Sequence, residues 1–286
     1  MPRANKPSVK AVEDAVVEVP EAKKANRYET ILEAIFLNHF KDSKGEFDFE
    51  RKEIEQVAAK LKIILPKNIG DALYSQRYRA AQWPEKIRKT IPEGCDWVIL
   101  PAGKSRYRFK LIRGNSRIVP RTDAAVIKVP DATPEIIAGN TLGDEQAVLA
   151  RVRYNRLIDV FLGITAYSLQ NHFRTTVKNM GQIEVDELYV GVNREGQQFI
   201  VPVQAKGGND QLSIVQSIQD IACCREKFPQ LTCRPVSAQF MPDETIAMFE
   251  MREEKDGLPR IAEEKHYSLV PFGDIETADL ERYRLK

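Results

Sequence analysis

Four polar residues on two neighbouring strand-like segments have the chemistry to hold a metal ion and a water molecule. The segment 181–190 carries Glu184 and Asp186. The next strand-like segment carries Gln204 and Lys206. Carboxylates are hard oxygen ligands that suit Mg²⁺, and an adjacent lysine can hold an attacking water or offset charge that develops on phosphorus oxygens. These residue types therefore indicate metal-assisted hydrolysis of a phosphate ester.

The turn between the two segments decides whether the four side chains share one face of a sheet. A three-residue loop, 194–196, places its glycine at the left-handed position that this class of hairpin needs. Counting back along the strands then sets Asp186 opposite Gln204. The same register sets Glu184 opposite Lys206. A loop of two or four residues would shift the register by one and separate the pairs.

Two further carboxylates are candidate metal ligands. Glu187 faces the other side of an ideal strand, although a β-bulge would re-aim it. Glu145 lies early in the preceding predicted helix and is a possible outer ligand. The alternative for Glu145 is an acid in the first turn that complements the helix dipole.

The motif resembles that of the PD-(D/E)XK nuclease superfamily, in particular its restriction-endonuclease-like members. The matching residues are Glu184-Val-Asp186 and, after seventeen intervening residues, Gln204-Ala-Lys206. The resemblance covers about residues 141–250 and implies a mixed sheet flanked by helices, in the order helix, three strands, helix, strand. It implies that Asp186 binds the divalent metal, Mg²⁺ or Mn²⁺. Gln204 stands where the family normally has a second acid, which removes a charge from the metal site.

The alternative for the same hairpin is a solvent-facing pair of strands with ordinary charged residues. Against it stand Val201, Val203 and Ala205, whose apolar side chains indicate a strand in the interior of a sheet. Three glutamines in and before the following helix also resemble a glutamine that follows the motif in some branches of the family. They are Gln211, Gln216 and Gln219.

Composition limits the class of protein. The chain has 286 residues, which is long enough for two modest domains. Its hydrophobic fraction of 43% and charged fraction of 29% are ordinary for a globular protein. No apolar run approaches the roughly 20 residues that span a bilayer, and the amino terminus lacks the apolar core of a signal peptide. We therefore expect a cytoplasmic protein without membrane contact. The four cysteines lack the paired spacing of a zinc site, and three histidines are too few for most histidine-based centres.

Positive charge is concentrated in the first half of the chain. Residues 1–130 contain 26 Lys and Arg against 17 Asp and Glu, whereas residues 131–286 contain 17 against 24. Within 67–121 the bias sharpens to 13 basic residues against 4 acidic ones. Clustered positive charge favours a polyanion as partner, because each phosphate contact releases condensed counterions. The alternative is a solvated basic face.

The basic region has the element order of a winged helix-turn-helix domain. Apolar residues recur at helical spacing over 28–40 and 50–61, and Pro66 opens a third predicted helix that extends to about Ala81. Two strand-like runs, 97–100 and 107–112, follow as a hairpin. In such domains the third helix enters the major groove and the hairpin rests on the flanking backbone.

We expect double-stranded DNA to contact the exposed polar residues of this domain. Arg and Lys bind phosphates, whereas Asn, Gln and bidentate Arg read base edges. The candidates are Asn68, Tyr74, Gln76, Arg77, Tyr78 and Arg79 on the third helix, and Lys104, Arg106 and Arg108 on the hairpin. The alternative is that Tyr74 and Tyr78, four residues apart, pack on the helix surface and that the module contacts protein.

The expected domains are a disordered tail over 1–26, a winged helix over 27–113, a linker rich in Pro and Gly over 114–140 and a catalytic domain over 141–286. In the last domain we expect a helix over 144–164 that continues, or is followed by a second helix, to Lys178. The two strands of the motif come next. A helix over 213–228, strands over 234–240 and 245–250 and a late strand-like patch over 266–270 complete the pattern.

The sequence thus predicts an α/β protein in which a winged helix precedes a restriction-endonuclease-like mixed sheet flanked by helices. The expected function is Mg²⁺-dependent, sequence-specific cleavage of DNA, as in a type II restriction enzyme, by a homodimer that matches the two-fold symmetry of the duplex. The main alternative is a non-catalytic winged-helix DNA-binding regulator, in which a degenerate nuclease fold serves for dimerisation or sensing. A nuclease that acts on branched or damaged DNA is a third hypothesis.

Overall fold

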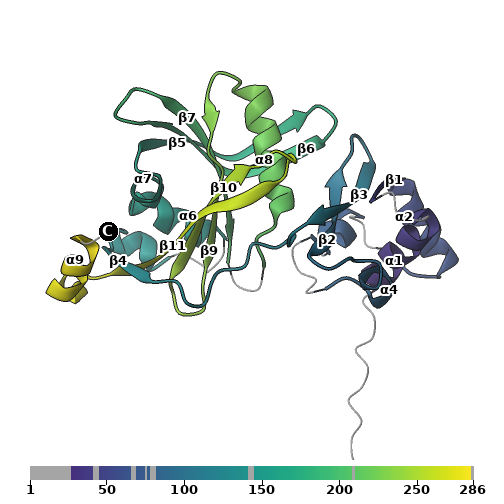
Figure 1. Ribbon diagram of the computed structural model, residues 1–286, viewed down its shortest axis with the longest axis horizontal. Coiled ribbons are helices and arrows are strands. Elements are labelled where there is room, and N and C mark those ends of the chain that lie inside the picture. The colour runs from purple at the N-terminus through teal and green to yellow at the C-terminus, as the bar shows by residue number, and fades with distance from the viewer. Residues whose placement is uncertain are drawn as a thin grey trace, which may run out of the picture.

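The computed structural model describes residues 27–40, 45–65, 69–74, 76–77, 82–140, 145–207 and 210–284. The predicted tail and the candidate DNA contacts Asn68, Tyr78 and Arg79 lie outside these ranges, as does the side chain of Glu145. Figure 1 shows two units side by side. The smaller unit comprises the described residues of 27–113, and the larger unit comprises those of 114–284.

The smaller unit is a three-stranded antiparallel sheet covered by helices. Its described elements are α1 (Arg27–His39), β1 (Glu46–Glu50), α2 (Arg51–Lys60), α3 (Gly70–Tyr74), α4 (Glu85–Arg88), β2 (Cys95–Pro101) and β3 (Arg106–Arg113). The strand order is β1-β3-β2. The apolar stripe of α1 is buried as its spacing predicts, because Ile31, Leu32, Ile35 and Phe36 are fully enclosed. The core is strongly aromatic, with Phe36 in edge contact with Trp97 and Phe109.

Two features of this unit differ from the expectation. Strand β1 was not predicted, although Phe47 and Phe49 alternate with acids in the way of a half-buried strand. Of the predicted third helix, 66–81, the described part has α-helical backbone over Gly70–Tyr74, and residues 66–68, 75 and 78–81 lie outside the described ranges. The next described residues, 76–77, have π-helical backbone, so the pair does not continue a regular α-helix.

The larger unit is built on an eight-stranded mixed sheet. Its described elements are β4 (Val126–Pro130), α5 (Glu135–Ala138), α6 (Glu145–Tyr154), α7 (Leu157–Leu162), β5 (Thr165–Val177), β6 (Gly181–Val192), β7 (Gln198–Lys206), α8 (Ile214–Lys227), β8 (Thr232–Cys233), β9 (Val236–Phe240), β10 (Ile246–Glu253), β11 (Pro259–Val270), a 3₁₀ turn (Phe272–Asp274) and α9 (Thr277–Arg284). The strand order is β4-β11-β10-β9-β7-β6-β5, with β8 beside β7. The β7–β9 and β4–β11 pairs are parallel, whereas β5–β6, β6–β7, β9–β10 and β10–β11 are antiparallel.

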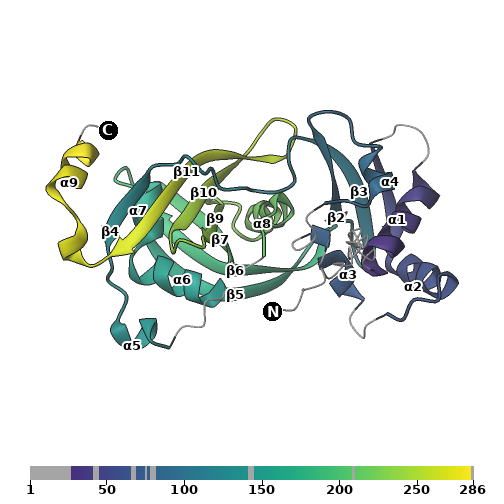
Figure 2. The same ribbon diagram turned by 90° about the horizontal axis from the view of Figure 1, so that it is seen from below.

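Helices cover both faces of this sheet, as Figures 1 and 2 show. Alternate residues of β10 belong to different cores: Ile246 and Met248 pack with the cluster that includes α6 and α7. Ala247 and Phe249 pack with the start of α8. The sheet is therefore buried on both sides, and the prediction of a mixed α/β sheet flanked by helices is confirmed.

The region around β5 corrects two predictions. The single helix expected over 144–164 is two helices, α6 and α7, because Arg156 adopts a left-handed conformation with a φ of 50°. The helix expected to reach Lys178 is strand β5, which pairs with β6 from Thr165–Val192 to Val177–Gly181. Most β5 side chains are exposed, so the strand carries little of the apolar alternation that marks a strand in the sequence.

The predicted linker over 114–140 is partly a structural element of the larger unit. Residues 126–130 form β4, whose Ile127 and Val129 pack against the α6–α7 core. Ile118 is buried beside the start of α8, and Arg117 forms an isolated bridge with Ser213. Only five residues contribute to β4, which is too short a run to stand out between prolines in the sequence.

The register predicted for the β6–β7 hairpin is confirmed. Gly196 has a φ of 82°, and the backbone N–H of Asn193 donates to the carbonyl of Gln197 over 3.1 Å. The ladder then runs from Val192–Gln198 to Glu187–Val203. It ends one pair before Asp186 and Gln204, where β6 leaves β7 and continues along β5.

The two units share a hydrophobic core. Val98 and Ile112 from the smaller sheet pack with Val215 of α8 and Phe249 of β10. In addition, a Cβ on Gly181, at the tip of the β5–β6 hairpin, would lie 3.7 Å from the carbonyl oxygen of Gly103 in the β2–β3 turn. The chain therefore joins its units by packing as well as by covalent connection.

Truncating Phe249 to alanine should test this shared core. We expect Phe249→Ala to lower the free energy of unfolding by about 3–5 kcal/mol, because a fully buried ring is lost. Both tryptophans of the chain, Trp83 and Trp97, lie in the smaller unit, so tryptophan fluorescence in urea should show the loss there. Ile261→Ala is the control, since that side chain on β11 is 44% exposed. An unchanged fluorescence transition in Phe249→Ala would show that the units unfold independently.

Candidate functional site

Asp186 lies beside β7 and faces α8. Its Oδ2 accepts a hydrogen bond from the backbone N–H of Ala205 over 3.0 Å. The same oxygen lies 3.4 Å from Nε2 of Gln216, on the first turn of α8. The carboxylate is therefore held where the β6–β7 ladder ends, between the sheet and the helix.

Gln204 and Lys206 follow on the same face of β7. Gln204 is 1% exposed, and its Nε2 donates to Oγ of Ser217 on α8 at 2.8 Å and to Oγ of Ser237 on β9 at 2.6 Å. Its Oε1 has no hydrogen-bond partner among the described residues. Lys206 is 4% exposed and pairs in register with Gln239 of β9.

Asp220 on α8 is a fourth polar member of this group. It is 1% exposed, and its Oδ1 has no hydrogen-bond partner within the described part of the chain. Burial, together with the nearby carboxylate of Asp186, raises the pKa of Asp220 well above its ordinary value, and the charge of Lys206 opposes the rise. A buried carboxyl group that shares a site with a second carboxylate and a lysine is a frequent feature of functional sites.

The sequence pattern missed Asp220. Gln216 and Asp220 lie four residues apart, so they share one face of α8. That face is buried although it is polar, because Ser217 is also fully enclosed. Polar residues at helical spacing in α8 were the signal in the sequence that could have indicated Asp220. That signal points to a site only when the sheet residues opposite the helix are known.

We define the α8-facing cluster as Asp186, Gln204, Lys206, Gln216 and Asp220. It offers two carboxyl groups, two amides and one ammonium group. No group of three or more His, Cys, Asp and Glu side chains gathers closely enough to hold a metal within the described ranges. A divalent ion at Asp186 and Asp220 would therefore complete its coordination with water and substrate phosphate oxygens, as Mg²⁺ commonly does.

Glu184 lies apart from this cluster. Its Oε1 is 2.9 Å from Nδ1 of His172, and its Oε2 is 3.0 Å from Nε of Arg174. The hydrogen bond from Arg174 lowers the pKa of Glu184. The expected pairing with Lys206 is not formed, because β6 has left β7 at this point and Glu184 pairs with Arg174 of β5.

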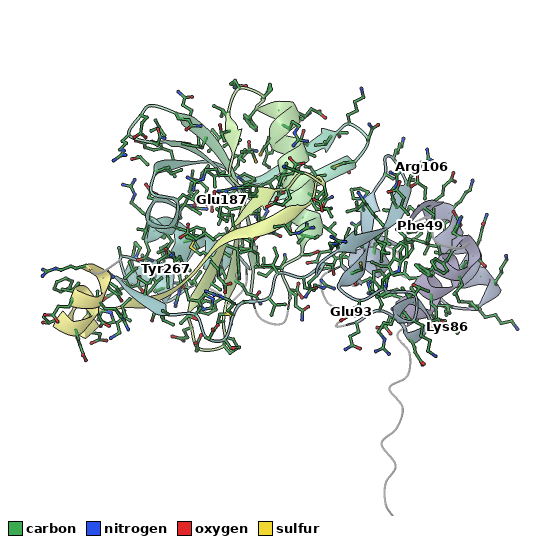
Figure 3. The ribbon with its side chains drawn as sticks, viewed as in Figure 1. Phe49, Lys86, Glu93, Arg106, Glu187 and Tyr267 are labelled. Carbon is green, nitrogen blue, oxygen red and sulfur yellow. The ribbon has the colours of Figure 1, made fainter. Side chains whose placement is uncertain are left out.

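Glu187 faces the opposite side of the sheet from Asp186. It is fully buried against α6, where Nε of Arg153 donates to its Oε1 over 2.8 Å. Oγ of Ser168 donates to the same oxygen over 2.7 Å. Figure 3 shows Glu187 enclosed in the larger unit. The ladder of β5 and β6 shifts register beside Ser168, but this irregularity does not bring Glu187 to the α8 side of the sheet. Glu187 and Asp186 therefore cannot bind the same metal ion.

The described candidate DNA contacts of the third helix, Tyr74, Gln76 and Arg77, make contacts within the protein. The hydroxyl of Tyr74 donates to Oδ2 of Asp210, just before α8, over 3.3 Å. Gln76 is buried rather than exposed, and Nε of Arg77 donates to the backbone carbonyl of Ile99 over 2.9 Å. The shared core brings this segment against the start of α8, which explains the difference from the expected exposed helix face.

The candidate contacts of the hairpin divide into two groups. Lys104 and Arg106 are exposed, and Figure 3 shows Arg106 at the outer surface of the smaller unit. Arg108 instead donates Nε and Nη2 to the two carboxylate oxygens of Asp48, at 2.6 and 3.2 Å. The hydrogen bond from Arg108 lowers the pKa of Asp48. The unpredicted strand β1 supplies this partner.

Comparison with models of protein families, with curated proteins and with solved structures gave no match for this chain. No helix in the described part of the chain is long and apolar enough to cross a membrane.

The raised pKa of Asp220 predicts a pH-dependent stability. Above the ordinary pKa of an aspartate the unfolded chain loses this proton while the folded chain keeps it, so unfolding releases a proton and stability falls as pH rises toward the folded pKa. Over that range the free energy of unfolding of Asp220→Asn should rise relative to that of the wild type by up to about 1.4 kcal/mol per pH unit. Urea unfolding at pH 5, 6.5 and 8 measures the difference.

The exposed Asp123 provides the control for this experiment. Asp123→Asn should follow the pH dependence of the wild type. If the free energy of unfolding changed with pH by the same amount in Asp220→Asn and the wild type, a buried, protonated carboxyl group at this position would be contradicted.

Proposed function

We propose that this protein is a Mg²⁺-dependent DNA endonuclease and that the α8-facing cluster is its active site. One observation carries the proposal: Asp186, Gln204 and Lys206 gather on one face of the sheet, with a buried carboxyl group from α8 beside them. Acids, a lysine and amides in this arrangement suit the hydrolysis of a phosphodiester bond.

The arrangement of elements supports the same proposal. Apart from the two-residue strand β8 between α8 and β9, the elements from α7 to β9 follow the order helix, three strands, helix, strand, which is the order implied by the resemblance to the PD-(D/E)XK nucleases. In the smaller unit, helices precede the β2–β3 hairpin, as in a winged helix-turn-helix domain. We propose that this unit grips the duplex and provides sequence readout.

Asp186 would be the principal metal ligand, and Asp220 would supply the second carboxylate. This role would compensate for Gln204, which carries no charge where the family usually has an acid. Mg²⁺, or Mn²⁺ in its place, would polarise the scissile phosphate and lower the pKa of a bound water. Metal binding would also draw the proton from Asp220, since a ligating carboxylate must be ionised.

Lys206 and Gln204 would act on the substrate side of the site. The ammonium group of Lys206 would position the attacking water and offset the charge that develops on the phosphorus oxygens. The amide of Gln204, held by Ser217 and Ser237, would keep its Oε1 directed at the water or the metal. Two copies of the chain would cut the two strands, because a two-fold dimer matches the symmetry of a duplex.

A non-catalytic DNA-binding regulator is the second candidate function. It is favoured by the burial of the cluster, in which Gln204, Lys206 and Asp220 each expose 4% of their surface or less. In that case the larger unit would serve for dimerisation or sensing. A preference for branched over linear DNA in the same cleavage assays would indicate the third class, a structure-specific nuclease.

Substitutions within and outside the cluster should separate these functions. Asp186→Asn and Lys206→Met should each lower the rate of plasmid cleavage in Mg²⁺ or Mn²⁺ by about 100-fold or more, because each removes stabilisation of charge in the transition state. Glu184→Gln is the matched control, since this acid is engaged with β5, and it should cleave at the wild-type rate. DNA binding without cleavage by the wild type in either metal would support the regulator instead.

Charge substitutions on the hairpin should test the proposed grip on DNA. Lys104→Gln should reduce the slope of the logarithm of affinity against the logarithm of salt concentration by about 1, because one phosphate contact is lost. Arg108→Gln should leave this slope nearly unchanged, since Arg108 is paired with Asp48. Fluorescence anisotropy with a labelled duplex over a range of salt concentrations measures both. Equal slopes for Lys104→Gln and the wild type would remove the hairpin from the DNA interface.

A further inference from the structure

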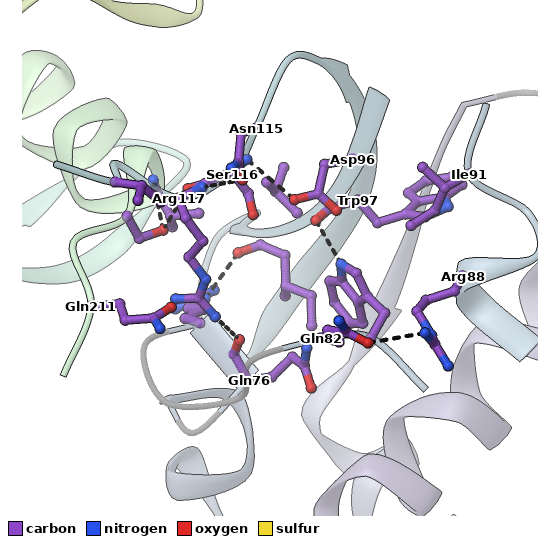
Figure 4. Close-up of a pocket in the computed structure, with 17 residues that line it drawn as sticks. Gln76, Gln82, Arg88, Ile91, Asp96, Trp97, Asn115, Ser116, Arg117 and Gln211 are labelled. Carbon is purple, nitrogen blue, oxygen red and sulfur yellow. Dashed lines mark hydrogen bonds between the residues drawn. The ribbon is translucent and has the colours of Figure 1, made fainter. Parts of the chain in front are cut away.

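A cleft of about 470 Å³ lies between the smaller unit and the residues that lead into α8. Figure 4 shows its walls: Arg117 and Gln211 reach in from one side, and Gln82 and Arg88 lie on the other. The volume falls within the range of roughly 300–1,000 Å³ that is typical of small-molecule sites. This cleft is separate from the α8-facing cluster, none of whose members lines it.

The cleft is positively charged. Arg77, Arg88 and Arg117 line it, and Asp96 is the sole acid among its described lining residues. Each guanidinium group is positioned by a neutral oxygen. Nη2 of Arg117 donates to the carbonyl of Gln76 over 2.7 Å, and Nη1 of Arg88 donates to Oε1 of Gln82 over 2.9 Å. Nε of Arg77 donates to a backbone carbonyl in the same manner. Such a wall favours an anion.

Gln76 adds a requirement that a simple anion does not meet. The side chain is 6% exposed and lines the cleft, yet its Oε1 has no hydrogen-bond partner among the described residues. Buried acceptors are nearly always paired, because an unpaired one loses its hydration without compensation. A ligand that satisfies this site must therefore donate an N–H or O–H group to Gln76 as well as accept from the arginines.

Trp83 gives the cleft a flat aromatic wall. Its Nε1 donates to the carbonyl of Trp97 over 3.1 Å, which fixes the orientation of the indole ring. The side-chain amides of Gln82, Asn115 and Gln211 also line the cleft. An oriented aromatic ring beside several amides suits a planar heterocycle whose edge carries both donors and acceptors.

We propose that this cleft binds a single nucleotide, with the base against Trp83 and Gln76 and the phosphate toward Arg117 and Arg88. A nucleotide combines the anionic group, the planar ring and the N–H donors that the three preceding features require. The same chemistry is offered by a free mononucleotide and by a nucleotide turned out of a DNA strand. The proposal does not depend on cleavage, because these residues are distinct from those of the α8-facing cluster.

Titration of the full-length protein with the four deoxynucleoside monophosphates, in EDTA, tests the proposal through the tryptophan fluorescence of the protein. Trp83 and Trp97 both line the cleft, so binding there is expected to give a saturable change in tryptophan fluorescence. Arg117→Gln should weaken binding by about tenfold or more, because a charge-assisted bond to the phosphate is lost. Arg121→Gln, an exposed arginine outside the cleft, is the matched control and should bind as the wild type.

Gln76→Leu provides a second test that does not depend on the fold tolerating a change at Arg117. Removal of an unpaired buried acceptor should raise the melting temperature, while the loss of the bond to the base should weaken nucleotide binding by about tenfold. A purely structural glutamine would not combine greater stability with weaker binding. Unchanged affinity in this variant would overturn the assignment of the base to Gln76.

Competitors distinguish the source of the nucleotide. Binding of free monophosphates would support a small-molecule site. Binding only of a duplex with one unpaired nucleotide, and not of the fully paired duplex, would support a site for an extruded nucleotide. The proposal fails if inorganic phosphate competes as well as the nucleotides, since that identifies a simple anion site, or if neither free nor extruded nucleotides change the fluorescence.

Discussion

The register of the β6–β7 hairpin fixes which side chains meet α6 and which meet α8. Its turn is held by Gly196 in the left-handed region and by the side chain of Asn193, whose Oδ1 accepts from the backbone N–H groups of Glu195 and Gln197 at 3.1 and 2.9 Å. A slip of one residue would exchange the two faces. Val203 would then meet the polar side of α8, and Gln204 would enter an apolar core.

The α8-facing cluster departs from ordinary packing in a specific way. A helix between two sheets usually buries apolar residues on its inner face, yet α8 buries Gln216, Ser217 and Asp220 there. Acceptor atoms of Gln204 and Asp220 have no partner in the described part of the protein, and each such atom costs about 1–3 kcal/mol. A local loss of stability of this kind is expected where a protein retains buried polar groups for binding or chemistry.

Local patterns in the sequence predicted the elements whose signals are local. The glycine in the 194–196 turn and the apolar alternation of β7 were sufficient to predict the hairpin and its register, and the helical spacing of Ile214, Val215 and Ile218 located α8. Strand β5 was not predicted, because its side chains are largely exposed and it is ordered mainly by its pairing with β6.

The candidate site was partly predictable for the same reason. Asp186, Gln204 and Lys206 share a hairpin, so a turn and a count of residues place them. Asp220 lies on a helix that packs across the sheet, so counting residues along the strands of the hairpin cannot predict its position. The alternation rule places Glu184 on the same face of β6 as Asp186, but Glu184 can meet Lys206 only where β6 remains beside β7. The divergence of the two strands is a property of the whole sheet.

The core shared by Val98, Ile112 and Phe249 has a mechanical consequence. A hinge between the units would have to open this core to water, at a cost of about 25 cal/mol for each Å² of apolar surface exposed. The shared core therefore opposes hinge motion between the units. If the proposed duplex touched both units, drawing the units together would carry this cost, whereas bending the duplex would bring the stiffness of its sequence into the free energy of binding.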